Sequence, residues 1–195
     1  MLYGGTLQVT SAGTNGTELS PQTFLDDQTA VRLQLAEPLQ PGATIELDLK
    51  FSGGLPRDFN SQQIYGTYHY ASDGQLLVMA NAFPMLALRQ DGIWRTDPVL
   101  AEGDAVISRT ALYIAEIRLP NGWQAAASGT VVNESEDQGG RVLQVAGGAL
   151  RDFMLVASPA LSLHQEDWQD MQINHWATEV VEDDWVDAGP VVRDS

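Results

Sequence analysis

The sequence predicts an all-β protein, an antiparallel β-sandwich followed by an acidic C-terminal extension. Three observations predict this fold. Apolar residues recur at every second position in several short runs, dipeptides that favour tight turns separate these runs, and no long segment has the spacing of an amphipathic helix. A period of two places one face of a strand in the core and the other in solvent, and tight turns join such strands as antiparallel hairpins.

The alternation of apolar and polar side chains is clearest in three runs. Residues 43–52 alternate apolar with charged side chains, and residues 31–35 repeat the same spacing. In residues 112–115, Leu112 and Ile114 share one face of the expected strand. Each run predicts a strand with one face buried.

Turn dipeptides separate the expected strands. A glycine that follows Asn, Asp or Gly readily takes the positive φ of a two-residue hairpin turn. Such dipeptides stand at Asp73-Gly74, Asp91-Gly92, Asn121-Gly122 and Gly139-Gly140. Further strands are expected at residues 75–80, 123–132, 141–146, 152–158 and 171–177, which gives about ten to twelve strands in all. Residues 179–185 are a candidate for a short helix, which two valines and the acidic composition of the segment disfavour.

The charge balance excludes some classes of partner. The 195 residues carry 26 acidic and 10 basic side chains, a formal net charge of −16. Such a protein repels phosphate backbones and anionic lipid surfaces, so we expect no nucleic-acid partner. The absence of cysteine excludes disulfides, thiolate zinc sites and cysteine nucleophiles.

Hydropathy predicts no membrane insertion. No run approaches the roughly 18 consecutive apolar residues of a membrane-spanning helix. Residues 1–10 lack the basic and apolar regions of a signal peptide, so the chain is either cytoplasmic or already processed. The localisation stays open, with an extracellular or cell-surface setting favoured over a cytoplasmic one.

Composition divides the chain in two. Residues 1–163 form the expected sandwich domain, whereas residues 164–195 hold nine acidic side chains and one basic one, Arg193. Three of the five tryptophans, Trp168, Trp176 and Trp185, also lie there. We interpret residues 164–195 as an acidic extension that lies against this domain or against another one.

The sequence contains no recognisable catalytic or metal-binding set. His69, His164 and His175 are widely separated, so a zinc site of His164 and His175 with Glu166, Asp167 or Asp170 is less expected than a solvated loop. Calcium ligands are conceivable, but without EF-hand spacing, at Glu182, Asp183, Asp184 and Asp187. Trp94 could stack on a sugar if exposed, whereas Trp123 is expected in the core. We therefore expect no catalytic residue and no metal ligand in this chain.

Several short motifs are collinear over about residues 25–160. They include NAFPMLA at residues 81–87, GIW at 92–94, DPV at 97–99, GDA at 103–105, the strand at 113–120 that ends in Leu-Pro, ASG at 127–129 and RDF at 151–153. The order of these motifs resembles the N-terminal β-domain of bacterial aminopeptidase N-type (gluzincin) zinc metallopeptidases. The resemblance implies that residues 164–195 are an acidic extension or the start of a linker to a missing catalytic domain.

The resemblance implies a saddle-shaped β-sandwich docked on a helical catalytic domain. The zinc ligands and general base of that family, an HExxH motif and a later glutamate, belong to the catalytic domain, so the resemblance implies zinc there and none in this chain. It also implies a polar side chain near the substrate amino terminus at Asn81, our single candidate substrate contact. A capping role for Asn81 in its own turn is the alternative.

The expected function is therefore that of a non-catalytic N-terminal domain. It would support the catalytic domain of the same polypeptide and shape the entrance for a peptide substrate. By itself the chain is not expected to be an enzyme. The alternative from a different class is an independent secreted β-sandwich that binds carbohydrate or calcium, which requires an exposed aromatic row or a cage of carboxylates.

Overall fold

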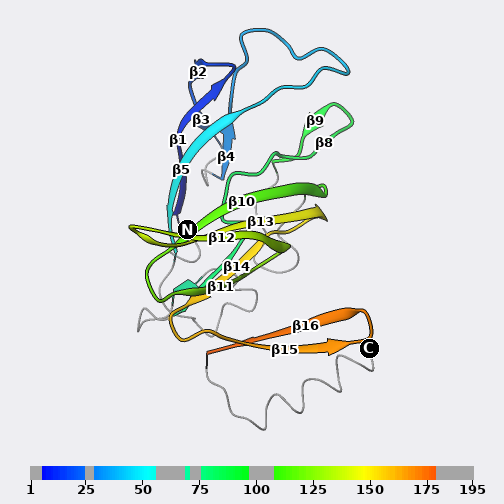
Figure 1. The fold of residues 1–195 in the computed structure, drawn as a ribbon. Helices are drawn as coiled ribbons and strands as arrows, with labels where there is room; N and C mark the ends of the chain where they lie inside the picture. The colour runs from blue at the N-terminus through cyan, green and yellow to red at the C-terminus, as the bar shows by residue number, and fades with distance from the viewer. Residues whose placement is uncertain (1–5, 25–28, 56–68, 71–75, 97–107, 179–195) are drawn as a thin grey trace, which may run out of the picture. The chain divides into compact units, whose positions relative to one another are not determined.

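The protein is all-β, as the sequence predicts. The computed structural model describes residues 6–24, 29–55, 69–70, 76–96 and 108–178, and all sixteen regular elements within them are strands (Figure 1). These residues fall into two compact units. The first unit holds the described residues up to 55 together with 81–96 and 108–109, and the second holds 69–70, 76–80 and 110–178.

The first unit contains a three-stranded antiparallel sheet and two small strand pairs. The sheet has the order β2-β1-β5 and is built from β1 (Thr6–Thr14), β2 (Thr17–Leu19) and β5 (Asp48–Gly54). The pairs are β3 (Gln22–Phe24) with β4 (Ala30–Arg32), and β8 (Arg89–Gln90) with β9 (Ile93–Trp94).

The turns of the first unit have the backbone conformation that hairpins need. Asp91 and Gly92 have φ of 52° and 83°, so the expected hairpin between β8 and β9 is confirmed. Asn15 and Gly16, with φ of 49° and 76°, join β1 to β2 in the same way. β1 and β2 were not predicted, although Asn15-Gly16 is a dipeptide that favours a hairpin turn between them.

The strand expected at residues 43–52 begins later than its alternation predicted. β5 starts at Asp48 because its partner β1 pairs with it only as far as Gly13, opposite Asp48, and then turns away. Beyond that point the Thr14 hydroxyl donates a hydrogen bond of 2.7 Å to the Glu46 carbonyl oxygen in place of a backbone ladder. Likewise β4 ends at Arg32, short of the expected residue 35. A strand ends where the backbone hydrogen bonds to its partner strand end.

The second unit is a β-sandwich. One sheet has the order β10-β13-β12, from β10 (Ala111–Leu119), β13 (Gly140–Leu150) and β12 (Thr130–Asp137). The other has the order β11-β14-β7-β6, from β11 (Gln124–Ala127), β14 (Met154–Ser158), β7 (Leu77–Ala80) and β6 (His69–Tyr70). Figure 1 shows β11 and β14 as a layer below β10, β13 and β12.

A hydrophobic core lies between these two sheets. Leu143 and Val145 of β13 are 2% and 1% exposed, and Ala157 of β14 is fully buried. Leu119, Ala125 and Leu155 complete the buried cluster. Trp123 and Phe153 pack against it, which confirms the core position expected for Trp123.

Two chain reversals in this unit differ from the sequence prediction. Residues 123–132 form two strands, β11 and β12, in different sheets. The break is at Gly129, whose φ is 103° and where a Cβ would come within 2.6 Å of the Ala146 carbonyl oxygen, so a side chain does not fit. Asn121-Gly122 is a turn between sheets instead of a hairpin, closed by a hydrogen bond of 3.1 Å from the Trp123 amide to the Pro120 carbonyl. β12 and β13 form the expected hairpin, but because Asp137 pairs with Gly140 its two turn residues are Gln138 and Gly139 instead of Gly139 and Gly140.

The last described elements form a hairpin of their own. β15 (Ser162–Trp168) pairs with β16 (Met171–Ala177), and β16 has the predicted bounds. β15 was not predicted, because its acidic composition hides the strand pattern. Residues 163 and 164, on either side of the expected domain boundary, both lie in β15. The helix expected at residues 179–185 lies outside the described residues.

Candidate functional site

Asn81, the predicted substrate contact, lies where the chain leaves β7. Its backbone has φ of 50°, in the left-handed region, and the residue is 8% exposed. Asparagine adopts this conformation more readily than most residues, because its short amide can hydrogen-bond to nearby backbone. Its neighbours Phe83 and Pro84 are half-buried. The backbone bends at Asn81, and the residue is buried.

The two histidines of the β15–β16 hairpin are separated along the sequence but lie opposite each other in the structure. His164 pairs in register with His175, and their ring centroids are 6.0 Å apart. Glu166 follows on the same face, with its Oε1 3.7 Å from His164 Nε2, a contact that is an ion pair only when the histidine is protonated. Asp167 points to the opposite face because side chains alternate along a strand, and Asp170 lies in the turn.

These side chains do not assemble a metal site. The part of the chain that the structure describes contains no group of three His, Asp or Glu side chains placed to hold a metal ion. For His69 the structure gives a place in β6 but no description of the side chain. The calcium candidates, residues 182–184 and 187, lie outside the described residues.

The tryptophans of the described residues do not form an exposed row. Trp94 is 51% exposed on the β8–β9 hairpin, where the Arg89 guanidinium lies 5.9 Å from its ring centroid. Trp168 and Trp176 are half-buried on the β15–β16 hairpin. Because side chains alternate along paired strands, Trp168 and Trp176 lie on opposite faces of that hairpin. The described tryptophans thus lack the aligned platform that a sugar-binding face requires.

The best-defined polar cluster surrounds Arg141 on β13. Its Nε donates a hydrogen bond of 2.5 Å to Glu134 Oε1 on β12, and its Nη1 donates to Gln124 Oε1 on β11. The hydrogen bond from Arg141 lowers the pKa of the Glu134 carboxyl, and the same bond raises the pKa of Arg141. Since β11 and β12 belong to different sheets, Arg141 ties the two layers together. Sequence reasoning missed this cluster because Gln124 and Arg141 meet only through the sandwich.

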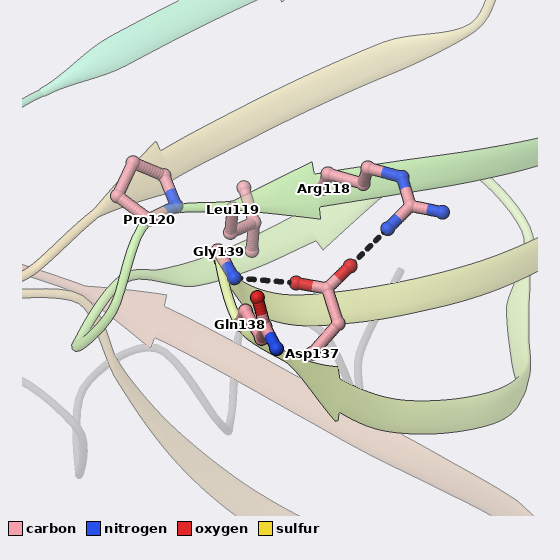
Figure 2. Close-up of a pocket in the computed structure, with 6 residues that line it drawn as sticks. All are labelled: Arg118, Leu119, Pro120, Asp137, Gln138 and Gly139. Atoms are coloured by element: carbon pink, nitrogen blue, oxygen red, sulfur yellow. Dashed lines mark hydrogen bonds and ion pairs between the residues drawn. The ribbon is translucent and has the colours of Figure 1, made fainter.

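In a shallow hollow at the end of β10, the charged side chains that line it contact other residues of this chain (Figure 2). Asp137 points into it, accepts a hydrogen bond of 2.8 Å from the Gly139 amide and pairs with Arg118. Arg118 also contacts Glu116, with 2.7 Å between Nη2 and Oε1. The hydrogen bond from the Gly139 amide to Asp137 stabilises the β12–β13 turn. Because two carboxylates already pair with the Arg118 guanidinium, the hollow offers no unpaired cation to an anionic ligand.

Comparisons with known proteins identify the fold. Neither a protein-family model nor a curated protein matches the chain. Among solved structures, it is similar to a two-domain M1 zinc metallopeptidase mutant bound to L-tryptophan, with a TM-score of 0.53 and 16% identity over 87% of this chain. It is also similar to an M1 zinc metallopeptidase from Deinococcus radiodurans, with a TM-score of 0.50 and 17% identity over 87%.

This likeness concerns one part of the neighbouring structures. The chain spans 37% of the length of each of them. The chain therefore shares the fold of a domain of these zinc metallopeptidases.

Among the described residues, no helix has the length and apolar character to cross a bilayer.

Proposed function

We propose that the chain is the non-catalytic N-terminal β-domain of an aminopeptidase N-like zinc metallopeptidase. In this role it supports the catalytic domain of the same polypeptide and shapes the entrance for a peptide substrate. The observation that carries the proposal is the likeness of 87% of the chain to 37% of a two-domain metallopeptidase. A part of that size leaves room for a second domain with the reactive groups.

The chemistry of the described residues fits a supporting domain. The cationic side chains of the clusters around Arg141 and Arg118 are already paired with carboxylates of this chain. A catalytic zinc site needs three protein ligands and one open position. We assign those ligands, and the zinc that would activate water, to the catalytic domain that the resemblance implies.

The test is to compare three proteins: the 195-residue chain, the longer product of the same reading frame, and that product without residues 1–195. We expect hydrolysis of an aminoacyl anilide and one bound zinc for the longest protein, and neither for the 195-residue chain after dialysis. The protein without residues 1–195 should keep zinc but lose catalytic efficiency or stability. Stoichiometric zinc in the 195-residue chain, or a reading frame that lacks a zinc-binding helix, would contradict the proposal.

For Asn81 we propose the substrate contact that the resemblance implies, next to the amino terminus of the peptide. The matched variants Asn81→Gly and Asn81→Ala separate this role from a role in the turn. Both remove the amide, but glycine keeps the left-handed backbone at low cost and alanine does not. A raised KM with Asn81→Gly in the longest protein, at unchanged stability, supports the contact. Wild-type kinetics with Asn81→Gly would leave Asn81 as a turn residue.

A further inference from the structure

The two faces of the β15–β16 hairpin differ in exposure and in composition. Side chains alternate along paired strands, and those of one face are Leu163, Gln165, Asp167, Gln172, Asn174 and Trp176. Five of these six side chains are exposed, and Trp176 is half-buried. On the opposite face most side chains are half-buried, including Ile173 and His175. We call the first face the amide face, because three of its side chains are carboxamides.

The three carboxamides of the amide face hold one another in place. Gln165 Nε2 donates hydrogen bonds of 3.0 Å to Gln172 Oε1 and to Asn174 Oδ1. Both donors of this NH2 group are thereby used. Among the described residues, no hydrogen bond uses Gln165 Oε1 or the NH2 groups of Gln172 and Asn174. The face therefore presents one acceptor and two donor groups whose orientation is fixed before a ligand binds, which lowers the entropic cost of binding.

The spacing of the two donor groups matches that of an extended peptide. Gln172 and Asn174 are two residues apart on β16, a distance of about 6.8 Å along an antiparallel strand. The carbonyl groups on one side of an extended peptide repeat at the same interval of about 6.8 Å. The NH2 groups of Gln172 and Asn174 can therefore donate to two successive carbonyls of a peptide that runs along β16.

We propose that the amide face binds the main chain of an extended peptide segment. At one end of the face Leu163 lies directly opposite Trp176, and Leu163 is 42% exposed. This pair offers an apolar contact to one large side chain of the peptide. Hydrogen bonds to the main chain then hold peptides of many sequences, and the apolar pair gives a preference among them. The site consists of residues of this chain alone, so it goes beyond the proposed function and requires no catalytic domain.

Charge narrows the class of peptide. Asp167, at the other end from Leu163 and Trp176, is the one charged side chain of the amide face. The net charge of −16 also repels acidic peptides. The partner is therefore a neutral or basic peptide segment. A sugar chain is a poorer fit, because the described tryptophans offer no aligned platform for it.

Nuclear magnetic resonance of the isotope-labelled 195-residue chain tests the proposal, because each side-chain NH2 and indole group gives its own signal. The probe is an acetylated and amidated hexapeptide of alternating threonine and alanine that ends in leucine. We expect the signals of Gln172, Asn174 and Trp176 to shift together, with a Kd on the order of 1 mM for so open a face. A lysine in place of the first threonine should tighten binding and a glutamate should weaken it; the reverse order would contradict the assignment.

A pair of matched variants tests whether the carboxamides bind the peptide. Asn174→Ala should raise the Kd at least about threefold, because it removes one of the two donor groups. Asn133→Ala makes the same change at an exposed position of β12 and should leave the Kd unchanged. Gln172→Ala replaces Asn174→Ala if circular dichroism shows that the latter is unfolded.

Three results would overturn the proposal. The first is that the peptide leaves the signals of Gln172, Asn174 and Trp176 unchanged. The second is an equal effect of Asn174→Ala and Asn133→Ala on the Kd. The third is a shift of the same signals by a methyl glucoside and not by the peptide, which would assign the amide face to a saccharide.

Discussion

Two leucines of the same sheet allow the sandwich to be tested with a single type of substitution. Leu143 is 2% exposed and faces the core, whereas Leu112 is 69% exposed on the outer face. Leu→Ala removes the same atoms at both positions. Only at Leu143 were those atoms fully withdrawn from water, and only there does their loss leave a cavity.

The expected magnitudes follow from this difference in burial. For Leu143→Ala the lost transfer free energy and the cavity together cost about 3–4 kcal/mol. For Leu112→Ala, with about a third of the side chain buried, the cost should stay below ~1 kcal/mol. In a chain of this length, the former corresponds to a drop in Tm of about 10 °C.

The assay is urea denaturation followed by tryptophan fluorescence. We expect a lower midpoint with an unchanged m-value for Leu143→Ala, and a midpoint near the wild type for Leu112→Ala. Equal losses, or a larger loss for Leu112→Ala, would refute the assignment of the inner and outer faces of this sheet.

Three further predictions concern side chains outside that pair. Phe153→Ala should cost about 2–3 kcal/mol in the free energy of unfolding, since Phe153 packs on the core while half-buried; an unchanged midpoint would contradict this. Asn81→Ala should destabilise the chain by about 1 kcal/mol, with Asn81→Gly closer to wild type, as measured by thermal unfolding. Glu134→Gln should cost about 0.5 kcal/mol at pH 7. Because the pKa of Glu134 is lowered by folding from its ordinary value of 4.5, its ion pair with Arg141 stabilises above that pH, and the difference from wild type should vanish in more acidic solution.

Local signals predicted the strands and turns that depend on nearby residues. Asp91-Gly92 closes the β8–β9 hairpin because both residues accept positive φ, and this preference belongs to the dipeptide itself. β16 has its predicted bounds because the period-two pattern and the flanking turn coincide. By contrast, β15 was not predicted because its polar and acidic side chains do not alternate with apolar ones. It forms a strand because it pairs along its whole length with β16.

Where the candidate site is concerned, the sequence could indicate residues but not their surroundings. The motif at residues 81–87 drew attention to Asn81, and the structure adds that this residue is buried with a left-handed backbone. The contact between His164 and His175 depends on the register of the β15–β16 hairpin. The hydrogen bond from Arg141 to Gln124 depends on the packing of two sheets. Neither contact follows from separation along the chain.

The sequence by itself determined that this protein is all-β, acidic and free of cysteine, because composition and a period of two are properties of the chain alone. Only the tertiary structure decided which face of each strand is inside. In β10 the alternation makes Leu112 and Tyr113 equally credible as core residues, and Leu112 proves to be the exposed one. The choice is made by the facing sheet, because its Leu155 and Ala157 form one buried cluster with residues of the β10-β13-β12 sheet, and Ile117 of β10 packs against that cluster. A period of two defines two faces, but only a partner from elsewhere in the chain can exclude water from one of them.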